Sequence, residues 1–79
     1  MRLKVRGTVV NIIANKNYGF ILADNGQQYF FHREDLNGNW EQLCKDWEEF
    51  GPDKINVTFD ARSTPKGPRA ANVELIQYT

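Results

Sequence analysis

The sequence predicts an all-β protein, in which five strands form one small barrel and a short helix is inserted between the third strand and the fourth. Three observations predict it. β-Branched and aromatic residues concentrate in short runs, turn-forming residues separate these runs, and one central stretch changes to helical spacing. At 79 residues the chain has room for one domain, which we expect to span residues 1–79.

The first three runs predict strands that follow one another through tight turns. Val5–Ile13 is rich in valine, isoleucine and threonine. The turn residues Asn15–Asn17 separate it from a second strand at Tyr18–Leu22. Asp24–Gly26 is a short-loop signal, because Asn and Gly tolerate a positive φ. A third strand at Gln28–His32 completes a three-stranded meander.

The pattern then changes to a helical one. Residues 34–51 contain no β-branched residue, and large apolar side chains recur at intervals of three, four and three, at Trp40, Leu43, Trp47 and Phe50. Asn39 is a suitable N-cap, with Gln42 three residues later, and Gly51 with Pro52 is a stop signal. We expect a helix from Trp40 to Phe50 that plugs one end of the barrel.

Strand-like alternation returns after the helix. Lys54–Ala61 places Ile55, Val57 and Phe59 on one side, residues 63–68 form a loop rich in Pro and Gly, and Ala70–Ile76 supplies a last strand. Five strands with a helical connection between the third and fourth match the five-stranded, partly open Greek-key barrel of the OB class.

Composition excludes several other classes of protein. The chain is 41% hydrophobic and 25% charged, and its apolar runs are only a few residues long, against roughly 20 for a membrane span. The charged N-terminus lacks the apolar run of a signal peptide. The single cysteine, Cys44, can form no internal disulfide, and with a single histidine it makes no ordinary zinc site. We therefore expect a cytoplasmic protein that needs no metal and no cofactor.

The formal net charge is zero, but the charges are unevenly distributed. Acidic residues dominate the middle of the chain, whereas basic residues lie near its two ends, at Arg2, Lys4, Arg6, Lys16, Arg62, Lys66 and Arg69. If both ends share one face of the barrel, that face is basic and attracts an anionic partner. The alternative is an ordinary set of solvated surface charges without a partner.

Aromatic residues of the third strand cannot all be buried. Alternation along the strand places Tyr29 and Phe31 on one face and Phe30 and His32 on the other. We expect the first pair to be buried, with Ile21, Leu36 and Val57 as core neighbours. Phe30 and His32 then point outward.

The second strand adds two more rings to the same side, Tyr18 and Phe20, with Gly19 between them as a flat gap across which a base can lie. Nucleic-acid bases can cover such rings, because stacking contributes roughly 1–3 kcal/mol per base and tolerates any sequence. Packing of the rings against the helix or against a partner protein is an equally open alternative.

Four blocks of sequence resemble the bacterial cold-shock and Y-box family. Tyr18–Ile21 and Tyr29–His32 are similar to that family's two ribonucleoprotein motifs. Gly7–Val9 resembles its first strand, and Lys66–Val73 resembles its Gly-Pro-x-Ala-x-Asn-Val ending. The four blocks occur in the family's order, and the likeness extends from Lys4 to Ile76, which is nearly the whole chain.

The resemblance implies a monomeric, single-stranded nucleic-acid-binding barrel whose binding face comprises Lys16, Tyr18, Phe20, Phe30 and His32. By this likeness Tyr18, Phe20 and Phe30 stack bases, His32 stacks or hydrogen-bonds, and Lys16 meets phosphate. Lys66 in the last loop lines the same groove, and Arg69 is a further candidate.

The chain also departs from the family's pattern. Asn11 stands where the family has a stacking tryptophan, and can at most hydrogen-bond to a base. Asn17 replaces a glycine, a change that Asn can tolerate if φ is positive. Arg33 replaces an aromatic residue, and its guanidinium can stack on a base while adding charge. The connection 34–53 is longer and more acidic than usual, and its Trp40 either covers the groove in place of the missing tryptophan or is buried, as we expect for Trp47.

Two functions from different classes remain open. The first is weakly selective binding of single-stranded RNA or DNA, as in an RNA chaperone. The second is a protein-interaction module, built on a cold-shock scaffold with reduced or lost nucleic-acid binding, that docks its partner through residues 34–53 and the remaining aromatic face. An enzyme is disfavoured, because nothing in the pattern places Cys44 beside His32 and the carboxylates gather in the connection.

Overall fold

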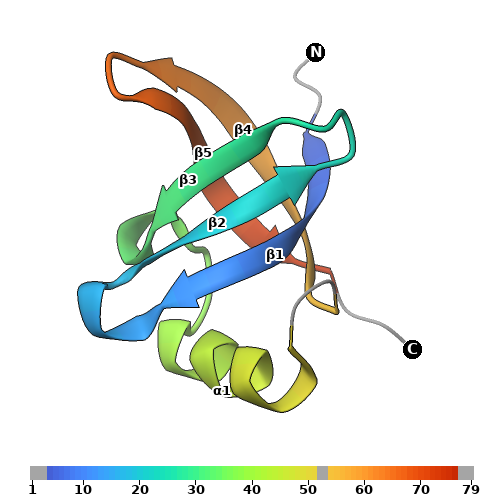
Figure 1. The fold of residues 1–79 in the computed structure, drawn as a ribbon, viewed down its shortest axis with the longest axis vertical. Helices are drawn as coiled ribbons and strands as arrows, with labels where there is room; N and C mark the ends of the chain where they lie inside the picture. Colours follow the sequence, from blue (N-terminus) through green and yellow to red (C-terminus); the bar gives the residue numbers. More distant parts are fainter. Residues whose placement is uncertain (1–3, 52–53, 77–79) are drawn as a thin grey trace.

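Five strands close into a barrel in the order β1-β2-β3-β5-β4, as Figure 1 shows for this computed structural model, which describes residues 4–51 and 54–76. The elements are β1 (Val5–Ile13), β2 (Tyr18–Ala23), β3 (Gln28–His32), α1 (Trp40–Phe50), β4 (Asn56–Thr64) and β5 (Gly67–Leu75). Short 3₁₀ turns lie at Ala14–Lys16 and Arg33–Asp35. The predicted class, a five-stranded barrel with a helix between the third and fourth strands, is confirmed.

The barrel is closed, whereas we expected it to be partly open. A short parallel pairing joins β3 to β5 at Phe30 and Arg69, and a second bridge joins Leu36 to Val73. On the other side, β1 pairs antiparallel with β4. Closure depends on these pairings of residues far apart in sequence, which no local pattern reveals.

The loop expected at residues 63–68 is wrong for most of its length. β4 continues to Thr64 and β5 begins at Gly67, so that only Pro65 and Lys66 lie in the turn. The Thr64 hydroxyl donates to the carbonyl oxygen of Gly67 (2.7 Å) and accepts from the backbone N–H of Lys66 (3.3 Å), while Gly67 has a φ of 122°. These bonds make a tight hairpin out of a segment whose composition suggested a loose one.

The remaining boundaries shift slightly. β1, β3 and α1 have the predicted bounds, and β2 extends one residue further, to Ala23. The fourth strand begins at Asn56 rather than Lys54, and the last strand ends at Leu75 rather than Ile76.

The core contains the inward-facing side chains of every strand. Tyr29 and Phe31 are buried as predicted, and so are their expected neighbours Ile21, Leu36 and Val57. The other large contributors are Val9, Leu43, Phe59 and Val73, none of which is exposed to solvent. Phe30 and His32 are only half-buried and lie on the outer side of β3, as alternation requires.

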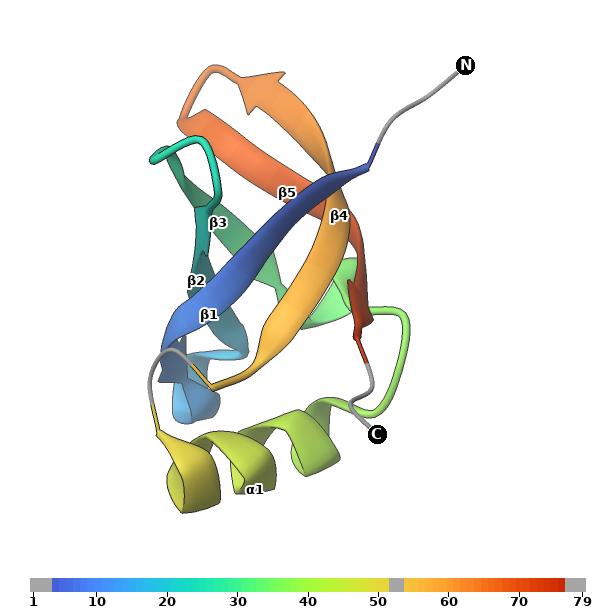
Figure 2. The same ribbon diagram turned by 90° about the vertical axis from the view of Figure 1, so that its right-hand side faces the viewer.

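α1 lies across one end of the barrel, which Figure 2 shows from the side. Asn39 caps it by accepting a hydrogen bond from the Gln42 backbone N–H at 3.1 Å, and the N–H of Gly51 returns to the Trp47 carbonyl at 2.9 Å. Leu43 is fully buried on the side of the helix that faces the barrel, and Trp47 is partly buried against the core. The expected apolar plug is confirmed. Pro52 lies outside the described residues.

Candidate nucleic-acid interface

Four rings gather on the outer side of β2 and β3, and we call Tyr18, Phe20, Phe30 and His32 the ring face. In the antiparallel register Tyr18 lies opposite His32 and Phe20 opposite Phe30, so that all four side chains leave the same side of the sheet. The ring centroids of the tyrosine and the two phenylalanines are 5.4–6.0 Å apart, at tilted or edge-to-face angles. All four residues are half-buried, so the rings support one another and still present surface to solvent.

Gly19 has a different role from the flat outer gap that we expected. Because Tyr18 and Phe20 point outward, the side chain at position 19 would point into the barrel. A Cβ there would lie 2.7 Å from the Asn11 carbonyl oxygen and 2.9 Å from the Phe31 ring. Glycine is therefore required by close packing inside the barrel, and not by a base lying across the strand.

His32 is fixed in orientation by the turn that follows it. Its Nδ1 accepts from the Glu34 backbone N–H at 3.1 Å, and its own backbone N–H donates to Asp35 Oδ2 at 2.9 Å. With Nδ1 occupied as an acceptor, the neutral imidazole carries its proton on Nε2. The ring can thus offer both a face and a donor to a ligand.

Asn11 lies beside the ring face, on the neighbouring strand. The register between β1 and β2 shifts between Val9 and Asn11, and beyond this irregularity Asn11 pairs with Phe20. Residues directly opposite each other share a side of the sheet, so the exposed Asn11 side chain lies next to the phenylalanine. It holds the place where the family's tryptophan would extend the ring face.

Two exposed cations flank the end of the ring face at which Tyr18 and His32 pair. Lys16 ends the first 3₁₀ turn and Arg33 begins the second. The two turns are joined because the Arg33 N–H donates to the Asn17 carbonyl at 2.8 Å. Asn17 has a φ of 62°, which confirms the positive φ expected where the family has glycine.

A hollow of about 380 Å³ lies at the other end, and we call it the ring hollow. Phe20 and Phe30 form its aromatic wall, and the β4–β5 hairpin supplies the rest: Thr64, Lys66, Gly67, Pro68 and Arg69. Both late basic residues considered from the sequence, Lys66 and Arg69, thus reach the ring face.

Arg69 is held in place by two groups at once. Its Nε donates to Asp35 Oδ2 at 2.9 Å, and its Cζ lies 5.7 Å from the centroid of the Phe30 ring. The Asp35 carboxylate also holds the backbone of His32. Asp35 was not among the residues predicted for the binding face. Its signal was local, since it stands three residues after His32, at the spacing of a capping box.

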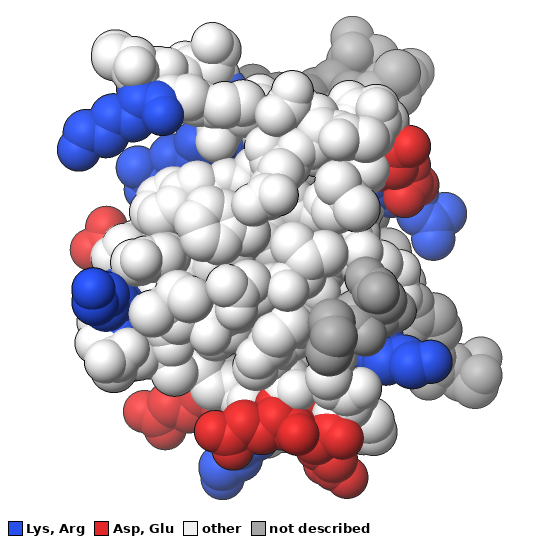
Figure 3. Space-filling view, in the orientation of Figure 1, with Lys and Arg blue, Asp and Glu red and all other residues white. Residues whose placement is uncertain are grey.

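Charge is separated on the molecule. In Figure 3 the side toward the viewer is largely uncharged, blue side chains gather over the β4–β5 hairpin, and red side chains form a band over α1. Near the N-terminus, Lys4 forms an exposed ion pair with Glu74 at 3.4 Å. Of the basic residues considered earlier, Arg2 lies outside the described residues.

Trp40 does not cover the ring face, so its assignment to the binding face is wrong. Its side chain is 5% exposed and packs edge-on against Phe31, with the ring centroids 5.9 Å apart. Phe31 points into the barrel, so a side chain stacked on it lies on the inner side of β3. The first turn of α1 closes the end of the barrel with this tryptophan. No aromatic ring therefore takes the place beside Phe20 where Asn11 stands.

Cys44 has the environment of a packing residue. It is half-buried against the core, and its burial raises the pKa of the thiol above its ordinary value. Glu48 and Glu41 also raise this pKa, whereas Arg33 lowers it.

Within residues 4–51 and 54–76, no three His, Cys, Asp or Glu side chains are grouped so as to hold a metal ion.

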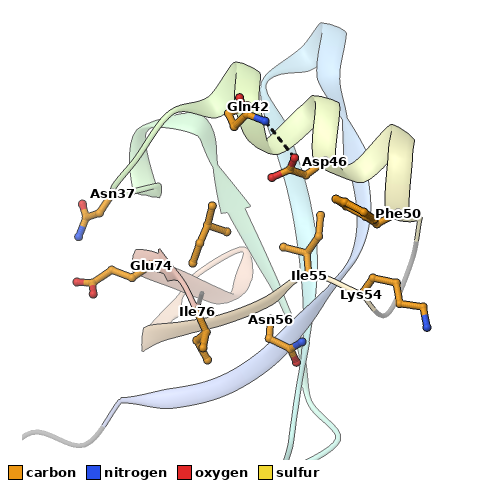
Figure 4. Close-up of a pocket in the computed structure, with 10 residues that line it drawn as sticks. Asn37, Gln42, Asp46, Phe50, Lys54, Ile55, Asn56, Glu74 and Ile76 are labelled. Carbon is orange, nitrogen blue, oxygen red and sulfur yellow. Dashed lines mark hydrogen bonds between the residues drawn. The ribbon is translucent and has the colours of Figure 1, made fainter. Parts of the chain in front are cut away.

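A second hollow, of about 580 Å³, separates α1 from the ends of β4 and β5 (Figure 4). Phe50, which is 56% exposed, and Ile55 contribute apolar surface, while Asp46 lies on the helix side and is bonded to Gln42 Nε2 at 3.0 Å. None of the residues that line this hollow belongs to the ring face.

Among the described residues no helix has the length and apolar character to cross a bilayer.

Comparison with known proteins gives a consistent result. The family model described as the 'Cold-shock' DNA-binding domain matches residues 5–76. The chain is 34% identical over 67 residues to cold shock protein 1 of Lactiplantibacillus plantarum, a match that covers 85% of this chain and 91% of that protein. It is 31% identical over 68 residues to the major cold shock protein of Streptococcus pyogenes serotype M18, covering 86% and 91%.

Proposed function

Because this chain belongs to the cold-shock domain family, we propose that it binds single-stranded RNA or DNA by stacking bases on the ring face. Membership in the family supports nucleic-acid binding in general and agrees with the prediction that the chain is not an enzyme. The finer proposal, with its mode of binding and its residues, rests on the geometry of the outer side of β2 and β3.

The observation that carries the proposal is the contact between the rings themselves. Tyr18, Phe20 and Phe30 touch at 5.4–6.0 Å and are half-buried by one another, so they stand ready without rearrangement. A preformed platform loses little side-chain entropy when a ligand binds. Each base that stacks there contributes roughly 1–3 kcal/mol, whatever its identity.

Phosphates remain toward solvent in this mode of binding, where exposed cations can meet them. Lys16 and Arg33 stand at the Tyr18 end of the ring face and Lys66 at the Phe20 end, so that a strand running along the face passes between them. His32 offers the flat surface of its imidazole or its Nε2–H to a base. Such contacts are weakly sequence-selective, which suits a chaperone that keeps transcripts unpaired in a cytoplasm.

The test is a titration of isotope-labelled protein with a short pyrimidine-rich single strand, followed through backbone amide shifts at low and moderate salt. We expect the shifts to cluster on the residues of the ring face and on Lys66, and to weaken as salt is added, since phosphate contacts release counterions. Absence of shifts at millimolar oligonucleotide would overturn the proposal.

A second candidate, the protein-interaction module, is favoured by the hollow under α1. Phe50 is the most exposed large apolar side chain of the described residues, and Asp46, Glu74 and Lys54 also line the hollow. A partner with an apolar side chain would suit the surface that Phe50 and Ile55 offer there. In the same titration, this candidate predicts no salt-sensitive shifts on the ring face when oligonucleotide is added.

A further inference from the structure

The ring hollow contains an arginine whose guanidinium is held by two contacts within the protein. Arg69 is bonded to Asp35 and lies against Phe30, and the described residues give no partner to its two terminal Nη groups. We propose that Arg69, positioned by Asp35, selects guanine for the ring hollow, an inference that rests on the nucleic-acid binding proposed above.

Charge favours a base over a phosphate as the ligand of Arg69. The Asp35 carboxylate lies 2.9 Å from Nε, with its side chain 14% exposed and that of Arg69 40% exposed, so it offsets part of the guanidinium charge. A phosphate at the free edge is therefore attracted less strongly than it would be by an unpaired guanidinium. A neutral base meets only the N–H donors. Lys66, exposed on the turn and without a carboxylate partner among the described residues, is the better phosphate contact.

Geometry favours guanine among the bases. With Nε engaged by Asp35 and the plane steadied by Phe30, the Nη groups form a fixed fork of donors with no acceptor. Guanine presents two adjacent acceptors, O6 and N7, to such a fork, whereas adenine presents one acceptor and one donor. Cytosine also has adjacent acceptors on its pairing edge, but it has a smaller ring system to lie against Phe20 and Phe30.

The hollow can hold such a base. It has a volume of about 380 Å³, and its wall of Phe20 and Phe30 offers a stacking surface beside the arginine. The pairing of these two residues could not be assigned from sequence spacing, because Asp35 and Arg69 are 34 residues apart. The pair meets only because β5 runs parallel to β3 and places Arg69 opposite Phe30.

The experiment measures binding of fluorescein-labelled seven-nucleotide deoxythymidine strands that carry one central dG, dA, dC or 7-deaza-dG, by anisotropy at several salt concentrations. A strand can shift its register until the single guanine reaches the hollow. We expect the dG strand to bind about tenfold more tightly than the dA strand, and 7-deaza-dG, which lacks the N7 acceptor, to lose most of that preference.

Three variants separate selection from charge. Arg69→Lys keeps the charge but lacks the fork, so it should abolish the dG preference and keep the affinity for plain deoxythymidine strands. Asp35→Asn frees the arginine, so the preference should fall while the salt dependence of binding steepens by about 0.7 in log–log slope. Arg62→Gln is the matched control, since Arg62 is exposed, pairs with Arg69 in the β4–β5 register and does not line the hollow. It should keep the preference.

The outcomes separate the inference from the proposed function. If the protein binds all four strands equally, or if Arg69→Lys retains the dG preference, base selection by Arg69 is wrong and nucleic-acid binding stands. A fourth variant, Arg69→Gln, removes both the fork and the charge: if it weakens binding of all strands by one factor and lowers the salt slope, Arg69 contacts phosphate instead. If no strand binds, both proposals fail. Thermal unfolding of each variant checks that the fold is intact.

Discussion

At the scale of single residues, the ring face combines exposure with mutual support. Each ring covers part of its neighbours, so the side chains are half-buried before any ligand binds. Rings that covered each other fully would leave no surface for a base, and isolated rings would be mobile. The spacing of 5.4–6.0 Å between centroids satisfies both needs, and single substitutions test it.

Phe30 contacts Tyr18, Phe20 and the guanidinium of Arg69. We expect Phe30→Ala to weaken oligonucleotide binding by about 1–3 kcal/mol, because one stacking surface is lost. Calorimetric titration with a deoxythymidine strand measures the change. Phe50→Ala is the matched control, since it removes the same side chain from an exposed position on α1. Equal affinities for the two variants would contradict stacking on Phe30.

Asn11 leaves a gap beside Phe20 that a larger ring can fill. We expect Asn11→Trp to strengthen binding by about 1–3 kcal/mol, because the indole adds a stacking surface on the same side of the sheet. The new tryptophan also provides a fluorescence signal that a bound base quenches. Asn11→Leu, which is apolar but not aromatic, should strengthen binding much less.

Cys44 should react slowly with alkylating reagents at neutral pH. Burial and two nearby carboxylates raise the pKa of its thiol, so the reactive thiolate is scarce. The rate of reaction with iodoacetamide, followed from pH 7 to pH 10, should reach half its maximum at a higher pH than for a free cysteine. Glu48→Gln removes one raising charge and should move that midpoint down. Because the folded pKa is raised, the same group destabilises the fold only as the pH rises above its unfolded pKa.

At the scale of elements, α1 closes the barrel and leaves the ring face open. Its first residue, Trp40, packs on the inward Phe31, and its acidic outer side points away from the sheet that carries the rings. The helix thus contributes to stability through one side and to charge separation through the other. Its N-terminus is the place where stability can be changed without touching the binding face.

Asn39→Ala should destabilise the protein by about 1 kcal/mol, because the Gln42 backbone N–H loses its acceptor. Denaturant unfolding measures the loss, and Asn39→Ser, which keeps a capping oxygen, should restore most of it. Oligonucleotide affinity at a temperature where both variants are folded should be unchanged. A fall in affinity without a fall in stability would mean that α1 contacts the ligand after all.

At the scale of the whole molecule, zero net charge is compatible with nucleic-acid binding because the charges are separated. The acidic band over α1 and the basic hairpin lie at different ends, with an uncharged surface between them in Figure 3. Long-range attraction is then weak, and local cations decide the electrostatic part of binding. The salt dependence of affinity reports how many of them take part.

We expect log Kd to vary with log salt concentration with a slope of about 2, as three phosphate contacts by Lys16, Arg33 and Lys66 would give at about 0.7 each on a single strand. Lys66→Gln should lower that slope by about 0.7 and weaken binding to all sequences alike. Affinity measured from 50 to 300 mM salt gives both values. A slope near zero would mean that the ring face binds without phosphate contacts.

The sequence by itself determined the first three strands, the helix and the side of the sheet on which the rings lie. Alternation in Gln28–His32 assigns each ring to the core or to the outside, and three-and-four spacing in Trp40–Phe50 identifies the helix. The positive φ of Asn17 agrees with the glycine that the family has at that position. These features depend on neighbours within a few positions, which is why a local pattern reveals them.

The tertiary structure alone decided what lies between elements. It closed the barrel through the β3–β5 pairing, buried Trp40 against Phe31, turned position 19 inward and joined Asp35 to Arg69. Each is a contact between residues distant in the chain, or depends on one, and its occurrence depends on strand order and register. Sequence periodicity specifies which face a residue occupies, but the residue it meets across that face is set by how the barrel closes.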